Sequence, residues 1–131
     1  MQTENEALAC QSVYLLHQWI ETVFTQPRSE AVLQQLLTSF HPAFTMVTTA
    51  GNTVTLDAVQ ALFHQHAGSR EGLRIEIDAC TVLATTPDSV LCRYRETHHQ
   101  AGIAQARWSV ALIEVVQQQA RWRFLQETAI A

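Results

Sequence analysis

The side chains best suited to chemistry alternate with apolar residues along two β-like stretches in the second half of the chain. A two-residue turn at 101–102 places Glu96 opposite Arg107 as an ion pair. The same register sets Tyr94 opposite Ser109. An arginine in an apolar setting can bind a carboxylate or enolate oxygen through two hydrogen bonds. A carboxylate beside it can act as a general base when burial raises its pKa. The alternation therefore predicts a polar cluster on an apolar face, which is the pattern of a small-molecule site.

The same alternation extends this predicted site to neighbouring segments. His98 shares the face of Glu96, and the last strand adds every second residue from Trp122. Glu96 and His41 are the candidates for an acid or base, because His41 is expected at the mouth of the pocket. A structural interpretation stays open, in which the Glu96–Arg107 pair neutralises itself and holds the register. The predicted pocket residues are Trp19, Tyr94, Glu96, His98, Arg107, Ser109, Trp122, Phe124, Gln126 and Thr128.

The six histidines do not have the spacing of a metal site. His64 and His66 are two residues apart on a predicted helix, so their side chains point in different directions. His98 and His99 are adjacent on a predicted strand and face opposite sides. Metal ligands must converge, so the sequence predicts no metal, and it indicates no cofactor.

The composition excludes several classes of function. The chain has eight basic and twelve acidic residues, and every basic residue is arginine. Without lysine, neither a Schiff base nor a phosphate-loop lysine is available. Without a basic stripe, we expect no nucleic-acid partner. Three cysteines without CxxC spacing predict free thiols in a reducing cytoplasm, and no stretch has the length of a membrane span or the pattern of a signal peptide.

The order of helical and strand patterns predicts an α+β fold in one domain, residues 1–131. Thr3 and Glu6 form a capping box before a helical stripe that runs from 8 to 23 and stops near Pro27. A second helix begins after Ser29 and ends before 41–42. The later segments are a small hairpin at 44–55, a third helix at 56–67 and four antiparallel strands at 73–84, 90–99, 104–116 and 121–130. The predicted order is ααββαββββ.

The face opposite the predicted pocket carries its own apolar patch. Trp108, Val110, Leu112 and Leu125 lie on neighbouring strands, and arginines surround them. A monomer would expose this patch to water, which soluble proteins seldom tolerate. We therefore expect a homodimer that pairs the two outer sheet faces.

Three stretches resemble the nuclear transport factor 2-like superfamily, which includes ketosteroid isomerases and SnoaL-like polyketide cyclases. They are 40–47 (FHPAFTMV) before a glycine hairpin, 93–96 (RYRE) followed by 107–109 (RWS), and 122–128 (WRFLQET). The chain is most similar to SnoaL-like proteins of unassigned function, which often end in His-Glu-Thr. The resemblance implies a cone-shaped curved antiparallel sheet wrapped around the N-terminal helices, with an apolar pocket, and it implies dimers that associate back to back.

The chain departs from the isomerase pattern at two positions. Thr48 stands where those enzymes have a carboxylate base, and Tyr14 lies on the outer side of the first helix. Three hypotheses remain. The chain binds a small apolar ligand that contains a carboxylate or carbonyl group; it is a cyclase, lyase or isomerase acting on an apolar carbonyl compound; or it is a structural dimerisation domain.

Overall fold

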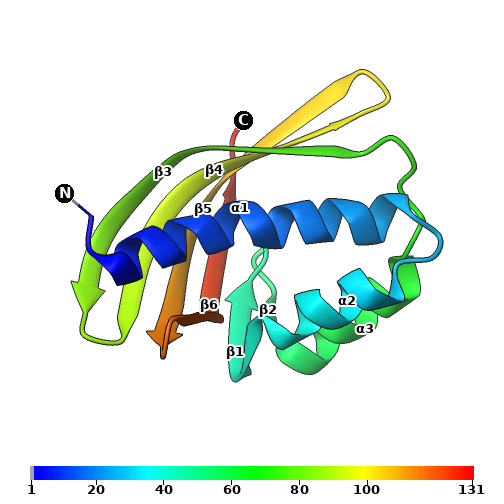
Figure 1. Cartoon of the computed structure of the whole chain (residues 1–131). Helices are drawn as coiled ribbons and strands as arrows, with labels where there is room; N and C mark the ends of the chain where they lie inside the picture. The colour runs from blue at the N-terminus through cyan, green and yellow to red at the C-terminus, as the bar shows by residue number, and fades with distance from the viewer. Residues whose placement is uncertain (1) are drawn as a thin grey trace.

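One long helix crosses the concave side of a curved sheet, and two shorter helices pack against it and against the strand β1 (Figure 1). The computed structural model describes residues 2–131. Within that range the elements are α1 (Glu4–Thr25), α2 (Glu30–Thr38), β1 (Phe40–Val47), β2 (Thr53–Thr55), α3 (Leu56–His66), β3 (Arg74–Thr86), β4 (Ser89–Gln100), β5 (Ile103–Val116) and β6 (Gln119–Ala129). The predicted α+β class and element order are confirmed.

Local interactions set both ends of α1. The Thr3 hydroxyl accepts a hydrogen bond from the Glu6 amide at 3.1 Å, and the Glu6 carboxylate accepts one from the Thr3 amide at 2.8 Å. This is the predicted capping box. At the other end, a Cβ on Gly68 would lie 2.8 Å from Pro27 Cα, so only glycine allows the end of α3 to pack this closely.

The sheet is mixed rather than wholly antiparallel as predicted. Its strand order is β2-β1-β6-β5-β4-β3, and β1 runs parallel to β6 while all other neighbours are antiparallel. The β4–β5 hairpin has the predicted register, with Glu96 opposite Arg107 and Tyr94 opposite Ser109. The face that carries these residues is concave and packs on α1.

A bulge in β6 reverses the predicted orientation of the last strand. Trp122 lies opposite Ile113 and Phe124 lies opposite Leu112, so Arg123 is an extra residue in β6. A single extra residue moves every later side chain to the other face. Leu125 is therefore buried on the concave side, where Glu127 joins it. The predicted placement of Phe124, Gln126 and Thr128 on the concave side is wrong.

A second bulge bends β3 around α1. Asp78 pairs with Arg95 and Thr81 pairs with Arg93, so two residues of β3 lie opposite one of β4. Ala79 is exposed and has a φ of 57°. The bulge brings Cys80 to 3.5 Å from Cys10 of α1, measured between the two sulfur atoms.

No helix within residues 2–131 combines the length and the hydropathy that a membrane span requires.

The backbone at Ala79 yields a test of this bulge. A left-handed conformation costs an L-residue about 1 kcal/mol that glycine does not incur. We expect Ala79→Gly to raise the free energy of unfolding by about 1 kcal/mol in urea denaturation. The control is Ala104→Gly on β5, an exposed strand alanine without a positive φ, which should lower the free energy of unfolding by about 0.5–1 kcal/mol. Equal losses in both variants would show that β3 has no left-handed residue at this position.

Candidate functional site

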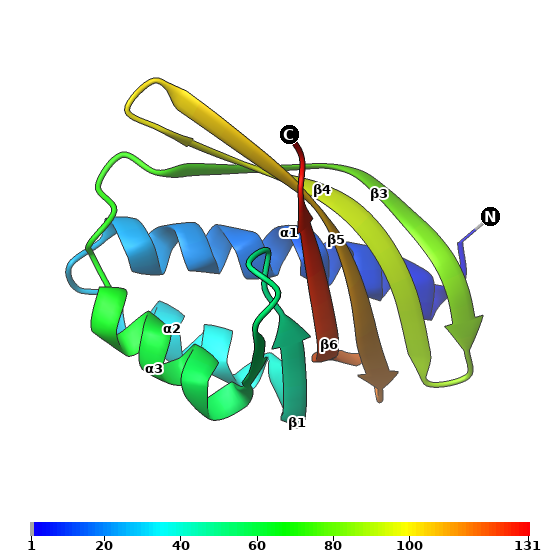
Figure 2. The ribbon, with the colours of Figure 1, turned by 180° about the vertical axis from the view of Figure 1, so that it is seen from behind.

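A largely apolar cavity of about 410 Å³ is lined by residues of α1, α3, β1 and the concave side of the sheet. Figure 2 shows these elements from behind. Four phenyl rings form much of its wall. Phe40 packs on Phe44 with ring centres 4.7 Å apart, and Phe24 packs on Phe63 at 5.7 Å. Charged and ionisable side chains line one end of the cavity, and we call them the polar cluster: His17, Glu96, His98, Arg107 and Glu127.

Glu96 is the central member of the polar cluster. The strand β4 aims it at the concave side, where only 4% of its surface is exposed. One carboxylate oxygen lies 3.1 Å from Nε2 of His17 on α1, and the other lies 2.5 Å from Nε2 of His98, two residues along β4. Two imidazole rings from different elements therefore share this carboxylate.

The contacts of His17 indicate that it is an imidazolium ion. Its Nδ1 lies 2.7 Å from the Val13 carbonyl oxygen, which can only accept a hydrogen bond, so Nδ1 carries a proton. Its Nε2 faces the Glu96 carboxylate, which also accepts. The negative charge of this carboxylate favours a second proton on Nε2, which gives the ring a positive charge.

Burial and charge act in opposite directions on this ion pair. Burial raises the pKa of Glu96, but the charge and hydrogen bonds of His17 and His98 outweigh it and hold that pKa well below its usual range. Burial lowers the pKa of His17, and the Glu96 carboxylate outweighs it, so the pKa of His17 is raised. Both shifts favour the charged form of the group concerned.

Tyr94 and Ser109 lie behind the polar cluster and do not line the cavity. Both are fully buried, and the Tyr94 hydroxyl lies 3.5 Å from Nε2 of His17. Burial, followed by the charge of Glu96, raises the pKa of Tyr94 well above its ordinary value. Tyr94 therefore stays neutral and supports the His17 ring from behind.

The predicted Glu96–Arg107 ion pair is wrong. Nη1 of Arg107 instead lies 3.4 and 3.5 Å from the two carboxylate oxygens of Glu127. The β6 bulge explains the change, because it turns Glu127 inward beside Arg107. Burial and the charge of Glu96 raise the pKa of Glu127, and Arg107 opposes that rise.

The remaining predicted residues lie elsewhere. His41 faces Glu114 at 3.6 Å in a separate surface hollow and is not at the mouth of this cavity. Trp19 and Trp122 line a different pocket, between α1 and α2. Phe124, Gln126 and Thr128 face outward. The predicted residues that do gather at the cavity or directly behind it are Tyr94, Glu96, His98, Arg107 and Ser109.

Two members of the polar cluster were missed. His17 falls four residues after Val13 and three before Ile20, within the apolar stripe of α1, and a histidine in such a stripe is a signal of burial. Glu127 gives no comparable signal, because only the β6 bulge turns it inward. Within residues 2–131, no three His, Cys, Asp or Glu side chains form a group that could hold a metal ion.

No family model and no curated protein matches the chain. Solved structures do match it. An NTF2-like protein of unknown function from Pseudomonas aeruginosa is 30% identical, with a TM-score of 0.90 over 95% of this chain and 99% of that one. NTF2-like proteins from Cytophaga hutchinsonii (13% identical, TM-score 0.69, 92% and 98% covered) and Pseudomonas putida (12%, 0.69, 95% and 87%) share the fold.

The His17–Glu96 pair predicts how stability depends on pH. The raised pKa of His17 makes its contribution complete below the ordinary value of 6.5, and that contribution is lost as pH rises through the folded pKa. The lowered pKa of Glu96 makes its contribution complete above the ordinary value of 4.5. The pair should therefore contribute most to the free energy of unfolding of the wild-type protein between pH 4.5 and pH 6.5. Above pH 6.5 this contribution should fall as His17 loses its proton.

Glu96→Gln should reverse this profile. Without the carboxylate, burial lowers the pKa of His17, so the variant gains stability as pH rises through 6.5. At pH 6 we expect it to lose about 3 kcal/mol of unfolding free energy, measured by urea denaturation. The control is Glu76→Gln, which removes the exposed partner of His99 and should cost under about 0.5 kcal/mol. A wild-type pH profile in Glu96→Gln would contradict the charged pair.

Proposed function

The chain belongs to the nuclear transport factor 2-like family, and we propose that its cavity binds a small, largely apolar molecule that carries one carbonyl or carboxylate group. One observation carries this proposal: an apolar cavity of about 410 Å³ has its ionisable groups gathered at one end. Apolar walls favour binding by removing hydrocarbon from water, while a few convergent polar groups fix the orientation of the ligand.

Arg107 is the group that would hold the polar end of the ligand. Only its Nη1 contacts Glu127, at distances longer than those of a tight ion pair, so the guanidinium keeps N–H donors for a ligand oxygen. Glu96 is unsuited to that role, because a carboxylate accepts hydrogen bonds and has no proton to donate to a ligand oxygen. A ligand carbonyl or carboxylate oxygen therefore finds its best donor at Arg107.

A second candidate function is proton transfer to or from such a carbonyl compound by His98. Its Nε2 lies 2.5 Å from Glu96 and its Nδ1 lies 3.4 Å from Nη1 of Arg70, so Nδ1 becomes free to exchange a proton with a substrate when Arg70 moves away. A carboxylate that orients an imidazole is a common arrangement in acid–base catalysis. The same geometry serves binding alone, so binding remains the first proposal.

Octanoate and 2-octanone test the role of Arg107. We expect both to displace an apolar fluorescent dye from the wild-type protein. Arg107→Met keeps a long side chain but removes every N–H donor, so it should weaken octanoate binding at least about tenfold while dye binding persists. The matched control is Arg121→Met, an exposed arginine outside the cavity, which should bind like wild type.

Two outcomes of this titration would contradict the proposal. Equal octanoate affinity in Arg107→Met and wild type would remove Arg107 from the site. If neither compound displaces the dye, the cavity does not bind apolar molecules that carry a carbonyl or carboxylate group. Deuterium uptake from solvent next to the carbonyl of bound 2-octanone, beyond the rate in buffer and abolished by His98→Ala, would replace simple binding with proton-transfer chemistry.

We also propose a homodimer formed through the outer face of the sheet. Trp108 is 36% exposed there, with Val110 and Leu112 further along β5, and the guanidinium groups of Arg93 and Arg95 each lie 5.6 Å from the Trp108 ring centre. Phe124 takes the place predicted for Leu125, which the β6 bulge turns inward. An aromatic centre with an arginine rim is typical of an interface.

Sedimentation of wild type and Trp108→Glu tests this interface. A charge in a desolvated interface is costly, so the variant should sediment as a 14.7 kDa monomer while wild type sediments as a dimer at tens of micromolar. The control is Ile103→Glu, which changes a residue that is 63% exposed at the end of the β4–β5 hairpin and should leave the dimer intact. A monomeric wild type would contradict the proposed dimer.

A further inference from the structure

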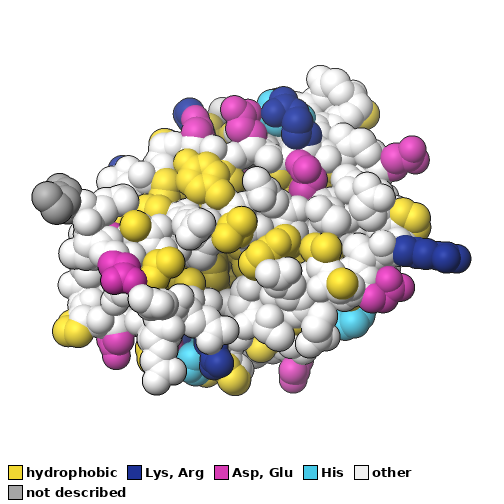
Figure 3. All heavy atoms as spheres, viewed as in Figure 1, with side chains coloured by type: hydrophobic (Ala, Val, Ile, Leu, Met, Phe, Trp, Pro, Cys, Tyr) yellow, Lys and Arg dark blue, Asp and Glu magenta, His cyan; other side chains and the backbone are white. Residues whose placement is uncertain are grey.

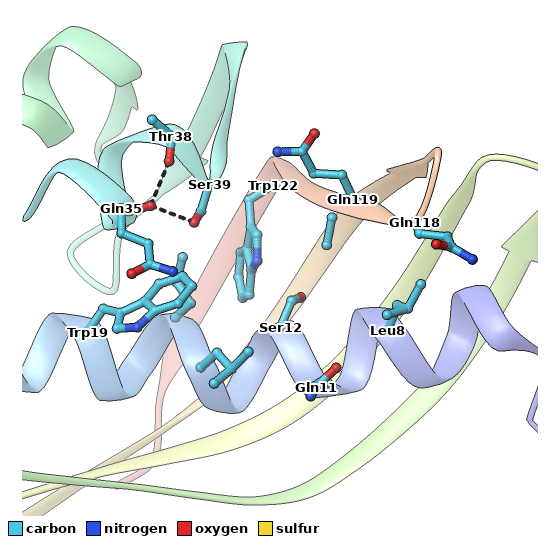
Figure 4. A pocket seen from close by; sticks show the side chains of 13 residues that line it. Leu8, Gln11, Ser12, Trp19, Gln35, Thr38, Ser39, Gln118, Gln119 and Trp122 are labelled. Atoms are coloured by element: carbon cyan, nitrogen blue, oxygen red, sulfur yellow. Dashed lines mark hydrogen bonds between the residues drawn. The ribbon is translucent and has the colours of Figure 1, made fainter. Parts of the chain in front are cut away.

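A second hollow opens on the other side of α1, between that helix, α2 and the turn from β5 to β6 (Figure 4). Its volume is about 270 Å³. Among residues 2–131, Leu16 alone lines both this hollow and the first cavity, so its side chain forms part of the wall between them. The two hollows therefore offer separate sites with separate chemistry.

The lining of the second hollow carries no charge. None of its 13 residues is acidic, basic or histidine. Figure 3 shows the corresponding face of the molecule, on which charged side chains lie mainly toward the edge. The polar lining residues are four glutamines and three hydroxyl residues: Gln11, Gln35, Gln118, Gln119, Ser12, Thr38 and Ser39. The Glu4 carboxylate contacts the lining through a hydrogen bond from Gln118 at 2.9 Å, but the lining itself offers an ion no counter-charge and favours a neutral, hydrogen-bonding ligand.

The three hydroxyl groups are committed as donors. Thr38 and Ser39 donate to the Gln35 main-chain carbonyl at 2.9 and 3.0 Å, as the dashed lines of Figure 4 mark. Ser12 donates to the Ala9 carbonyl at 2.7 Å. Since their protons are used, these hydroxyls can offer only oxygen lone pairs to a ligand. The glutamine amides offer both donors and acceptors.

Two tryptophans add an aromatic surface and an unused donor. Trp19 is partly buried at one side of the hollow, and Figure 4 shows Trp122 standing between Trp19 and Ser12. Trp122 is fully buried, yet its Nε1 has no hydrogen-bond partner among residues 2–131. A buried donor without an acceptor is costly, but this nitrogen is shielded from the hollow, so a ligand oxygen reaches it only if a neighbouring side chain moves.

We propose that the second hollow binds one ring of a neutral sugar. A sugar ring carries hydroxyl groups that both donate and accept, which matches acceptor hydroxyls beside glutamine amides. Its C–H face can pack on an indole, as Trp19 offers. A hydrocarbon ligand would leave the amides without partners, and a charged one would find no counter-ion. The proposal uses none of the polar cluster and is independent of the function proposed for the first cavity.

Matched glutamines on α2 provide the test. Glucose, N-acetylglucosamine and maltose are titrated into the protein, and binding is followed by saturation-transfer NMR. Gln35→Ala should weaken the binding of the best sugar about fivefold, because it removes an amide that lines the hollow. Gln34→Ala, which changes an exposed neighbour outside the hollow, should leave affinity unchanged.

A tryptophan pair checks the aromatic contact. Trp19→Ala should weaken sugar binding about tenfold, whereas Trp108→Ala, on the outer sheet face, should not change it. Circular dichroism confirms that each variant is folded. Absence of saturable binding for all three sugars up to about 0.1 M would overturn the proposal. Binding that Gln35→Ala and Gln34→Ala weaken equally, or benzoate binding at this hollow as tight as that of the sugar, would also overturn it.

Discussion

A carboxylate inside an apolar cavity must be matched by positive charge and hydrogen bonds, and Glu96 imposes this constraint on the whole fold. An isolated buried carboxylate would be protonated or would destabilise the protein by several kcal/mol. Here the strand β4 supplies His98, and the long helix α1 supplies His17. The second contact requires α1 to lie across the concave face at one position along its length. The docking of the helix therefore supplies one of the charge partners that the buried carboxylate requires.

Bulges in β6 and β3 decide which side chains meet inside the sheet. The bulge in β6 turns Glu127 toward Arg107 and frees Glu96 for the histidines. The bulge in β3 bends that strand around α1. Without the first bulge, Glu127 would face outward, and Arg107 would lie opposite Glu96 with no second carboxylate nearby. The extra residue in β6 thus changes which charged side chains of β4, β5 and β6 contact one another.

The helix α1 separates two hollows of opposite character. One is an apolar cavity with ionisable groups at one end, and the other is an uncharged polar hollow with two tryptophans. Trp122 belongs to the wall between them, because its ring packs 6.0 Å from the His17 ring while it also lines the second hollow. The two sites are close in space, and the different chemistry of their linings separates the ligands that each would accept.

Periodicity and local signals were sufficient for much of this protein. Three features follow from the sequence: the capping box at Thr3, the order of the elements, and the backbone register that sets Glu96 opposite Arg107 in the β4–β5 hairpin. Each depends on neighbours along the chain or on a short turn. The burial of His17 is also encoded in the stripe of α1. Its partner is not, because a helix stripe specifies which residues face the core and leaves open what they meet there.

The orientation of Glu127 and Leu125 depends on a bulge that arises from how β6 packs against β5 and β1, and no local pattern predicts it. Strand alternation has a period of two, so one unpredicted residue exchanges the inner and outer faces. The sequence alone determined the order of the elements and the face that carries Glu96, and tertiary packing decided the parallel pairing of β1 with β6 and the charge partners of Glu96.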